Sequence, residues 1–159
     1  MRFILTKELG RLAKWLRILG FDAEYFTENK ESTLIIKALQ EDRVILTRNA
    51  HLGQHVGIKR LNIRFDDVHQ QLRQAIEELA LKPDAALMFN RCTICNEELL
   101  KADKENIKDK VPEYVLNTSE EFMSCPRCRR TYWRGSHWGN VNAILKEISS
   151  LLRYRVIAL

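Results

Sequence analysis

The first 82 residues alternate between strand-like segments and amphipathic stretches. The strand-like segments are 2–6, 22–26, 43–47 and 60–65. Apolar residues recur at helical spacing in three other segments, which are 8–19, 32–41 and 68–80. Strands and helices that alternate in this way form a mostly parallel sheet covered on both faces. The pattern therefore predicts an α/β domain over residues 1–82.

Local signals place the ends and inner faces of these helices. Gly20 follows the first apolar stripe and is expected to end that helix as its C-cap. Ser32 or Thr33 is expected to cap the second helix. The side chains expected to face the sheet are Leu9, Leu12, Ala13, Leu16 and Leu19, then Leu34, Ile35, Ala38 and Leu39, then Val68, Leu72, Ala75, Ile76 and Leu79.

The pattern changes after Lys82-Pro83-Asp84, where we expect a domain boundary. Short apolar runs at 86–89, 111–115 and 122–123 predict small strands in a second segment over 83–138. The remainder, 139–159, has helical spacing and predicts a C-terminal helix that packs back on the body.

All four cysteines lie in the second segment and form two C-x-x-C pairs, Cys92 with Cys95 and Cys125 with Cys128. Each pair can present two thiolates from one tight turn, and two turns complete a tetrahedral site that suits zinc. Four sulfur ligands leave no position for water, so the predicted zinc is structural. The alternatives are two disulfides or a redox pair; disulfides need an oxidising compartment.

The charge and the apolar content of the chain indicate which classes of partner it can have. Lys and Arg number 26 against 21 Asp and Glu, which favours a polyanionic partner such as RNA. No apolar run reaches membrane-spanning length, and the start of the chain does not resemble a signal peptide, so we expect a cytoplasmic protein without membrane contact. A Gly-rich phosphate loop, a Rossmann fingerprint and a Ser-His-Asp signature are all missing from the sequence.

Basic residues gather in two places that suit phosphate contacts. Arg11, Lys14 and Arg17 recur every third residue along the first helix, although a solvated face explains them equally well. After the last cysteine, arginines mix with aromatic residues, a mixture that contacts phosphates and stacks on unpaired bases. The alternative is that Tyr132 and Trp133 pack the cysteine-containing segment against the α/β domain. The complete set of predicted RNA-binding residues is Arg11, Lys14, Arg17, Arg48, Arg129, Arg130, Arg134 and His137.

Several motifs, in order, resemble one known family. Leu9–Gly20 resembles the opening signature of the Mut-seven C-terminal ribonuclease family, and Val44–Asn49 resembles its second signature. Arg91–Asn96, Cys125–Cys128 and the stretch 132–138 resemble its zinc ribbon. The resemblance implies a PIN-like α/β domain fused to a zinc ribbon, and an RNA-directed role with hydrolysis of RNA as the activity.

PIN-like nucleases hold Mg²⁺ or Mn²⁺ with clustered carboxylates. At the positions to which the resemblance assigns those acids, this chain has Thr6, Glu31-Ser32 and Asn49. Only Glu31 is acidic there, and we predict that Asp66 and Asp67 join it, with Thr6 and Asn49 as neutral auxiliary ligands. Small shifts of the alignment would bring in Glu8 or Glu28, but Glu8 would have to enter from the first helical turn and is not favoured.

Three hypotheses follow for the function. The first is a metal-dependent endoribonuclease that uses Glu31, Asp66 and Asp67. The second is a non-catalytic RNA-binding module that has kept the fold and lost its acids. The third is an adaptor in which the zinc ribbon docks a protein partner, with Trp133 and Trp138 as anchors.

Overall fold

The computed structural model describes residues 1–52, 54, 57–133, 141, 143–144 and 146–147. Within this part the chain forms two compact units, Met1–Asn96 and Glu97–Leu159. Most of the predicted C-terminal helix over 139–159 lies outside the described residues, and those that are described there, 141, 143, 144, 146 and 147, are helical.

The first unit is built on a parallel sheet of four strands, β1 (Arg2–Leu5), β2 (Asp22–Tyr25), β3 (Arg43–Thr47) and β4 (Arg60–Asn62). Their order is β2-β1-β3-β4, and every neighbouring pair is parallel. This confirms the predicted α/β architecture. Because the strands run in parallel, their carboxyl ends lie at one edge, and Leu5 of β1 is in register with Tyr25 and with Leu46.

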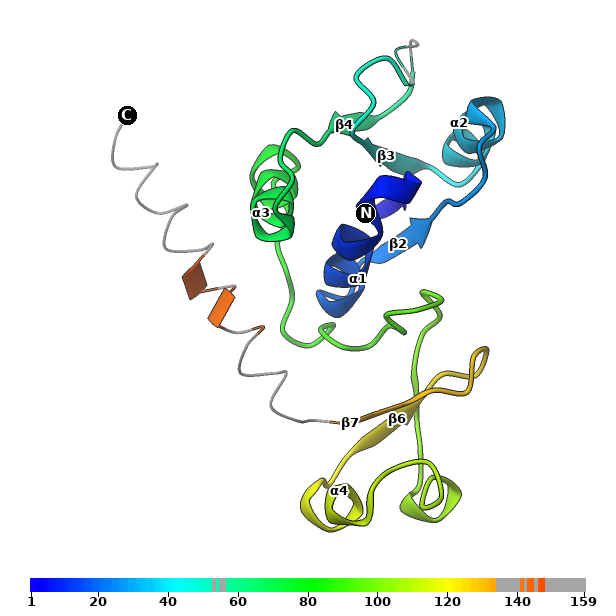
Figure 1. Cartoon of the computed structure of the whole chain (residues 1–159), viewed down its shortest axis with the longest axis vertical. Coiled ribbons are helices and arrows are strands. Elements are labelled where there is room, and N and C mark those ends of the chain that lie inside the picture. Colours follow the sequence, from blue (N-terminus) through cyan, green and yellow to red (C-terminus); the bar gives the residue numbers. More distant parts are fainter. Residues whose placement is uncertain (53, 55–56, 134–140, 142, 145, 148–159) are drawn as a thin grey trace. The chain divides into compact units, whose positions relative to one another are not determined.

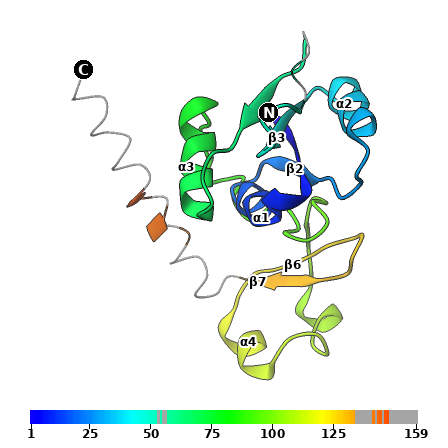
Figure 2. The same ribbon diagram turned by 45° about the horizontal axis from the view of Figure 1, so that its top comes forward.

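Helices cover both faces of this sheet (Figures 1 and 2). The short 3-10 turn η1 (Lys7–Leu9) leads into α1 (Gly10–Ile18), which packs beside α3 (Val68–Glu78). On β1, alternate side chains point to opposite faces, yet Phe3, Ile4 and Leu5 are each 0% exposed. The helix α2 (Glu31–Gln40) supplies the cover over Ile4 through Leu34 and Ala38.

The helix predictions hold for most positions and fail at a few. The first apolar stripe is buried as expected. The C-cap of α1 is Leu19 rather than the predicted Gly20, which comes next in the chain with a φ of +87°. The cap prediction for Ser32 or Thr33 is wrong, because α2 begins at Glu31 and its N-cap is Lys30. Leu39 was expected to face inward but is 55% exposed, since it lies at the last turn of α2, beyond the sheet-facing Ala38.

The predicted strand at 86–89 is also wrong, because residues 85–89 form turns. Asp84 starts this conformation. Its side chain accepts a hydrogen bond of 2.9 Å from the Ala86 N–H, and its carbonyl accepts bonds from the N–H groups of Leu87 and Met88. An Asx turn of this kind competes with an extended backbone. The apolar run is therefore not a strand, and Leu87 is 52% exposed.

The second unit contains a small antiparallel sheet in the order β5-β6-β7. Its strands are β5 (Leu100–Lys101), β6 (Phe122–Ser124) and β7 (Thr131–Trp133), and β6 and β7 lie side by side in Figure 2. Two short helices, η2 (Lys104–Asn106) and α4 (Glu113–Thr118), lie between β5 and β6 in the sequence. The predicted strand at 122–123 is confirmed as part of β6.

The predicted strand at 111–115 is wrong because α4 begins at Glu113. Pro112 occupies the N-cap, where its fixed φ suits the start of a helix and its missing N–H costs no hydrogen bond. The apolar residues of this stretch still serve as core, with Val111 and Val115 packed beside Ile107 and Phe122.

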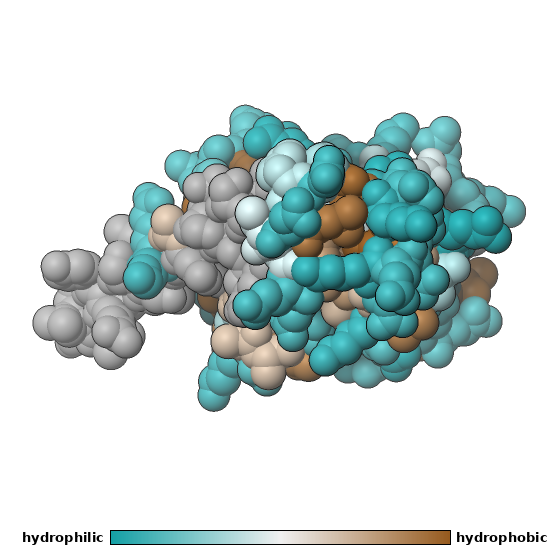
Figure 3. Space-filling view, turned by 90° about the horizontal axis from the view of Figure 1, so that it is seen from below, coloured by the Kyte–Doolittle hydropathy of each residue, from teal (hydrophilic) through white to brown (hydrophobic). Residues whose placement is uncertain are grey.

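Figure 3 shows one face of the molecule, on which hydrophilic residues surround a smaller hydrophobic area.

Candidate functional site

A pocket of about 250 Å³ opens at the carboxyl ends of the central strands, the edge at which parallel α/β sheets bind ligands. Three parts of the chain supply it: the end of β1 with η1, the loop before α2 with the start of that helix, and the end of β3. The lining residues are Thr6, Lys7, Glu8, Phe26, Glu28, Asn29, Lys30, Glu31, Leu34, Thr47, Asn49 and Leu52.

Glu8 is an acidic residue of this pocket that several hydrogen bonds hold in place. One oxygen of its carboxylate, Oε1, accepts hydrogen bonds from the hydroxyl of Thr6, from the backbone N–H of Arg48 at 3.0 Å and from the hydroxyl of Thr47 at 3.4 Å. Thr6 directly follows β1 and Thr47 is the last residue of β3, so hydrogen bonds from the ends of both central strands reach Glu8. Glu8 was not favoured because it would have to enter from the first helical turn. It does enter from there, since the tight η1 turn brings its carboxylate to the strand ends.

These contacts keep Glu8 ionised. Burial by itself raises the pKa of the Glu8 carboxyl, but the hydrogen bonds from Thr6, Arg48 and Thr47 favour the charged form, and the net result is a lowered pKa. At neutral pH the pocket therefore contains a fixed negative charge at Glu8. A signal for this was present in the sequence, because Glu8 lies only three residues beyond the end of β1 at Leu5.

Thr6, Glu31 and Asn49, which are far apart in the sequence, line the same pocket. The two neutral residues are engaged by the chain itself. Thr6 donates to Glu8, and the side-chain oxygen of Asn49 accepts a bond of 3.0 Å from the His51 N–H. Glu28, which a small shift of the alignment would bring into the acidic site, also lines the pocket. Ser32, at the other departure from the acidic pattern, is not among the lining residues.

Asp66 and Asp67 do not line this pocket. Asp66 is 87% exposed at its side chain and forms an ion pair of 2.5 Å with Arg48. Asp67 is the N-cap of α3, and its carboxylate accepts bonds of 3.0 Å from the N–H groups of His69 and Gln70. The bond from Gln70 is the main reason that the pKa of Asp67 is lowered. The contacts that the structure gives Asp66 and Asp67 therefore lie outside the pocket that contains Glu31.

The predicted basic face of α1 is only partly exposed. Arg11 and Lys14 are exposed, but Arg17 is buried at 4% exposure. The prediction that Arg17 contacts RNA is wrong, because its guanidinium is used inside the first unit. The sequence carried a hint of this, since Arg17 follows the buried Ala13 by one helical turn.

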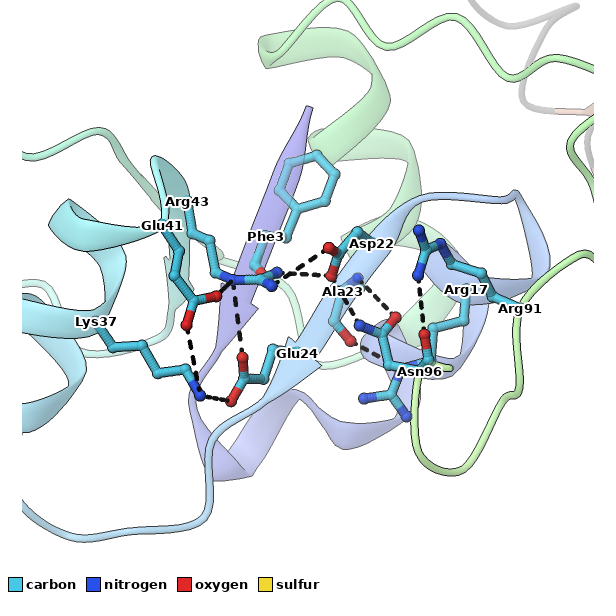
Figure 4. Close-up of polar contacts among 10 residues, drawn as sticks. All are labelled: Phe3, Arg17, Asp22, Ala23, Glu24, Lys37, Glu41, Arg43, Arg91 and Asn96. Carbon is cyan, nitrogen blue, oxygen red and sulfur yellow. Dashed lines mark hydrogen bonds and ion pairs between the residues drawn. The ribbon is translucent and has the colours of Figure 1, made fainter. Parts of the chain in front are cut away.

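The contacts of Arg17 join α1 to the sheet and to the first cysteine turn. Figure 4 shows the contact with Ala23 of β2. The Nε of Arg17 donates to the carbonyl of Ala23 at 2.8 Å. Its NH1 donates to the carbonyls of Thr93 and Ile94, each at 2.9 Å. Thr93 and Ile94 are the residues between Cys92 and Cys95. Burial lowers the pKa of Arg17, while the thiolates of Cys92 and Cys95 act in the opposite direction.

The remaining predicted RNA-binding residues divide into three groups. Arg129 and Arg130 are exposed in the second unit, next to the half-buried Tyr132 and the exposed Trp133. Arg48 is exposed but paired with Asp66. Arg134 and His137 lie outside the described residues.

The four cysteines form a group suited to a metal ion. The Sγ atoms of Cys92, Cys95, Cys125 and Cys128 all lie within 4.8 Å of one another, and these four cysteines are not joined in disulfides. In each turn the N–H of the second cysteine points at the sulfur of the first, at 3.5 Å for Cys95 and 3.3 Å for Cys128. These N–H groups stabilise a charged sulfur. The donor set therefore fits a tetrahedral metal.

Both cysteine turns close in the same way. The next residue, Asn96 or Arg129, has a positive φ of 68° or 60°. Its N–H donates to the carbonyl of the first cysteine, at 3.0 Å for Asn96 and 2.9 Å for Arg129. The repeated geometry shows that the two C-x-x-C pairs are equivalent chelating turns.

A comparison with models of known protein families shows to which family the chain belongs. The sequence model of the Mut7-C RNAse domain matches residues 1–145. The chain belongs to this family. The Mut7-C match covers the pocket and both cysteine turns, and it points to a ribonuclease type of function. No curated protein and no solved structure matches the chain. Among the helices of the described residues, none is long and apolar enough to cross a membrane.

Proposed function

We propose that the chain acts on RNA as a metal-dependent endoribonuclease of the Mut7-C type, with the strand-end pocket as its cutting site. One observation carries the proposal. Thr6, Glu31 and Asn49, the positions at which the family resemblance puts the acidic site, line a single pocket. Glu8 and Glu28 add carboxylates there, in place of the predicted Asp66 and Asp67.

The pocket fits Mg²⁺ or Mn²⁺ by donor type, since both prefer oxygen ligands. A bound divalent ion would activate water and offset charge on the scissile phosphate. Among the described residues, however, the glutamates of the pocket do not converge as closely as the four cysteines do. We therefore propose that Glu8 and Glu31 hold the ion together with RNA phosphate oxygens, as Mg²⁺ is commonly held.

The basic residues of the pocket have a role that needs no metal. Lys7 of η1 and Lys30, just before α2, both line it, and the Nζ of Lys7 donates to the Asn29 side chain at 3.0 Å. Two ammonium groups at the rim offer point charges to an RNA phosphate. They would position the strand above the glutamates.

The test is cleavage of a labelled structured RNA with Mn²⁺, comparing wild type with Glu31→Gln and with Glu105→Gln. Glu105 is an exposed glutamate of the second unit and serves as the matched control. We expect wild type and Glu105→Gln to cut, and Glu31→Gln to lose at least about 100-fold of the rate, because one ligand charge is removed. Cutting that survives in Glu31→Gln, or that needs no divalent ion, would exclude this site.

A second function, RNA binding without cleavage, is favoured by the state of Glu8. Its Oε1 already accepts three hydrogen bonds from the chain, which leaves less of the carboxylate for an ion. This function predicts intact RNA with wild type and with Glu31→Gln, together with a gel shift in the same samples. The shift would persist in EDTA and weaken steeply with salt.

We also propose that the metal held by the cysteines is zinc and that its role is structural. Four thiolates close the tetrahedron, so no position is open for water or substrate. Thiolates persist in a reducing compartment, which supports a cytoplasmic site of action. Elemental analysis of the purified chain should give one zinc per chain, lost in Cys92→Ser. A protein without zinc, or with these cysteines oxidised in the cell, would contradict the assignment.

A further inference from the structure

The strand β2 lies at the edge of the parallel sheet, where backbone groups normally remain open to solvent or to another strand. At Ala23 both of these groups are taken by side chains (Figure 4). The Ala23 carbonyl accepts a hydrogen bond of 2.8 Å from the Nε of Arg17, and the Ala23 N–H donates a hydrogen bond of 3.0 Å to the Oδ1 of Asn96. Two side chains thus take the place of a neighbouring strand.

These same two residues hold the first cysteine turn. Arg17 binds the carbonyls of Thr93 and Ile94, inside the turn, at 2.9 Å each. Asn96 closes the turn through its backbone, and its Nδ2 donates to Asp22 at 2.7 Å. The turn is therefore fastened to the sheet edge at its middle and at its end.

The supporting contacts are themselves fixed. Asp22 is held by Arg43, whose NH1 lies 2.6 Å from its carboxylate, and Arg43 also donates to the carbonyl of Phe3 in β1. Arg91 binds the carbonyl of Asn96 at 2.9 Å. Every one of these residues belongs to the unit Met1–Asn96. The anchors of the first turn therefore do not depend on the second cysteine pair.

Charge gives Arg17 a second reason to be buried at this place. Four thiolates around one divalent cation leave an excess of two negative charges. A buried guanidinium, which keeps its charge and presents several donors in a plane, offsets part of this excess. By contrast, the turn Cys125–Cys128 is surrounded by hydrogen bonds within its own segment, such as Arg129 N–H to Cys125 and Cys125 N–H to Arg130.

We propose that Cys92 and Cys95 form a half-site that the α/β domain holds in its chelating shape before any metal binds, with Arg17 as the positioning residue. The second pair then completes the site when metal is present. This inference rests on the proposed zinc binding. If wild type binds no zinc, the zinc assignment fails, whereas zinc binding with a first turn that is unordered before loading overturns only the present inference.

The first experiment measures amide hydrogen exchange by NMR on the full chain, reduced and stripped of metal. The amides of Asn96 and Arg129 are equivalent, since each donates to the carbonyl of the first cysteine of its turn. We expect Asn96 to exchange at least 10-fold more slowly than Arg129 without metal, and both to be slow with zinc. Equal exchange of the two amides without metal, including loss of protection throughout the unit, would overturn the proposal.

The second experiment measures zinc affinity by competition with a chelator for Arg17→Met, Arg17→Lys and Arg64→Met. Arg64 is an exposed arginine of the same unit, 62% exposed at its side chain, and is the matched control. We expect Arg17→Met to bind zinc at least 10-fold more weakly, Arg17→Lys to be intermediate, and Arg64→Met to match wild type. Unchanged affinity in Arg17→Met would refute the role of Arg17.

A third variant covers the case in which Arg17→Met fails to fold. Asn96→Gly keeps a residue that adopts the positive φ of 68° at the end of the turn, but it deletes the amide that binds Ala23 and Asp22. In the metal-free chain this variant should lose the slow exchange at position 96 while the sheet amide of Ile45, which donates to Lys59, stays protected. Slow exchange at both positions would contradict the proposed anchoring.

Discussion

The carboxylate of Glu8 accepts a hydrogen bond of 3.0 Å from the backbone N–H of Arg48, a residue 40 positions further along the chain. This contact joins the turn after β1 to the loop after β3, across the strand ends that form the pocket. It fixes an ionised group at the place where the resemblance led us to expect the acids of a nuclease. The charge of Glu8 thus enters the pocket from η1 rather than from the end of β1 itself.

Stability at low pH should depend on Glu8. Its pKa in the folded state is below the ordinary value of 4.5, so its ionised form stabilises the fold above pH 4.5, and this contribution is lost as the pH falls through the lowered value. Glu8→Gln should lower the free energy of unfolding by about 1 kcal/mol at pH 7. The free energy of unfolding of this variant should also decrease less steeply than that of wild type below pH 4.5. Urea denaturation from pH 7 to pH 3 measures both, with Glu105→Gln as the control. Parallel pH profiles for Glu8→Gln and wild type would contradict the prediction.

Asp67 should matter for stability rather than for cutting. Asp67→Ala removes the cap of α3 and should cost about 1 kcal/mol, whereas Asp67→Asn keeps a capping oxygen and should cost less. Asp66→Ala removes only an exposed ion pair and should change stability by less than about 1 kcal/mol. Thermal denaturation checks the order of the three variants. RNA cleavage lost in Asp67→Asn at full stability would restore Asp67 to the active site.

Two glycines with nearly the same positive φ should respond differently to alanine. Gly20 and Gly57 have φ values of +87° and +89°. A Cβ at Gly20 would overlap the backbone of Leu87, while a Cβ at Gly57 would meet nothing within 4 Å. Gly57→Ala should therefore cost only the strain of positive φ, about 1 kcal/mol, and Gly20→Ala clearly more. Equal losses in urea denaturation would mean that the segment around Leu87 shifts freely.

RNA affinity should depend on salt through α1. Arg11 and Lys14 are exposed there, so Arg11→Ala and Lys14→Ala should each weaken binding and reduce the slope of log affinity against log salt by about 0.7 for a single strand. Filter binding at several salt concentrations gives the slopes, and Lys59→Ala, at an exposed lysine outside the proposed surface, is the control. Slopes equal to that of wild type would remove α1 from the RNA surface.

Apolar spacing predicted the α/β unit well because its core residues repeat with the periods of helices and strands. The same reasoning failed at 86–89 and at 111–115, where local polar and proline effects outweigh apolar runs. The family resemblance put Thr6, Glu31 and Asn49 at the acidic site, and all three line one pocket. The sequence did not indicate the contacts of Glu8 and Asp67, because hydrogen bonds over 40 residues and a helix cap leave no periodic pattern.

The sequence by itself determined the parallel α/β architecture, the family and the four-cysteine metal site, since each depends on residue types at fixed short spacings. Only the tertiary structure decided which charges face solvent. Arg11, Lys14 and Arg17 share a spacing, but only Arg17 turns inward, where the carbonyls of Ala23, Thr93 and Ile94 take its donors. A buried cation such as the Arg17 guanidinium needs hydrogen-bond acceptors around it. The fold brings these acceptors from other segments, and the residues next to Arg17 in the sequence do not supply them.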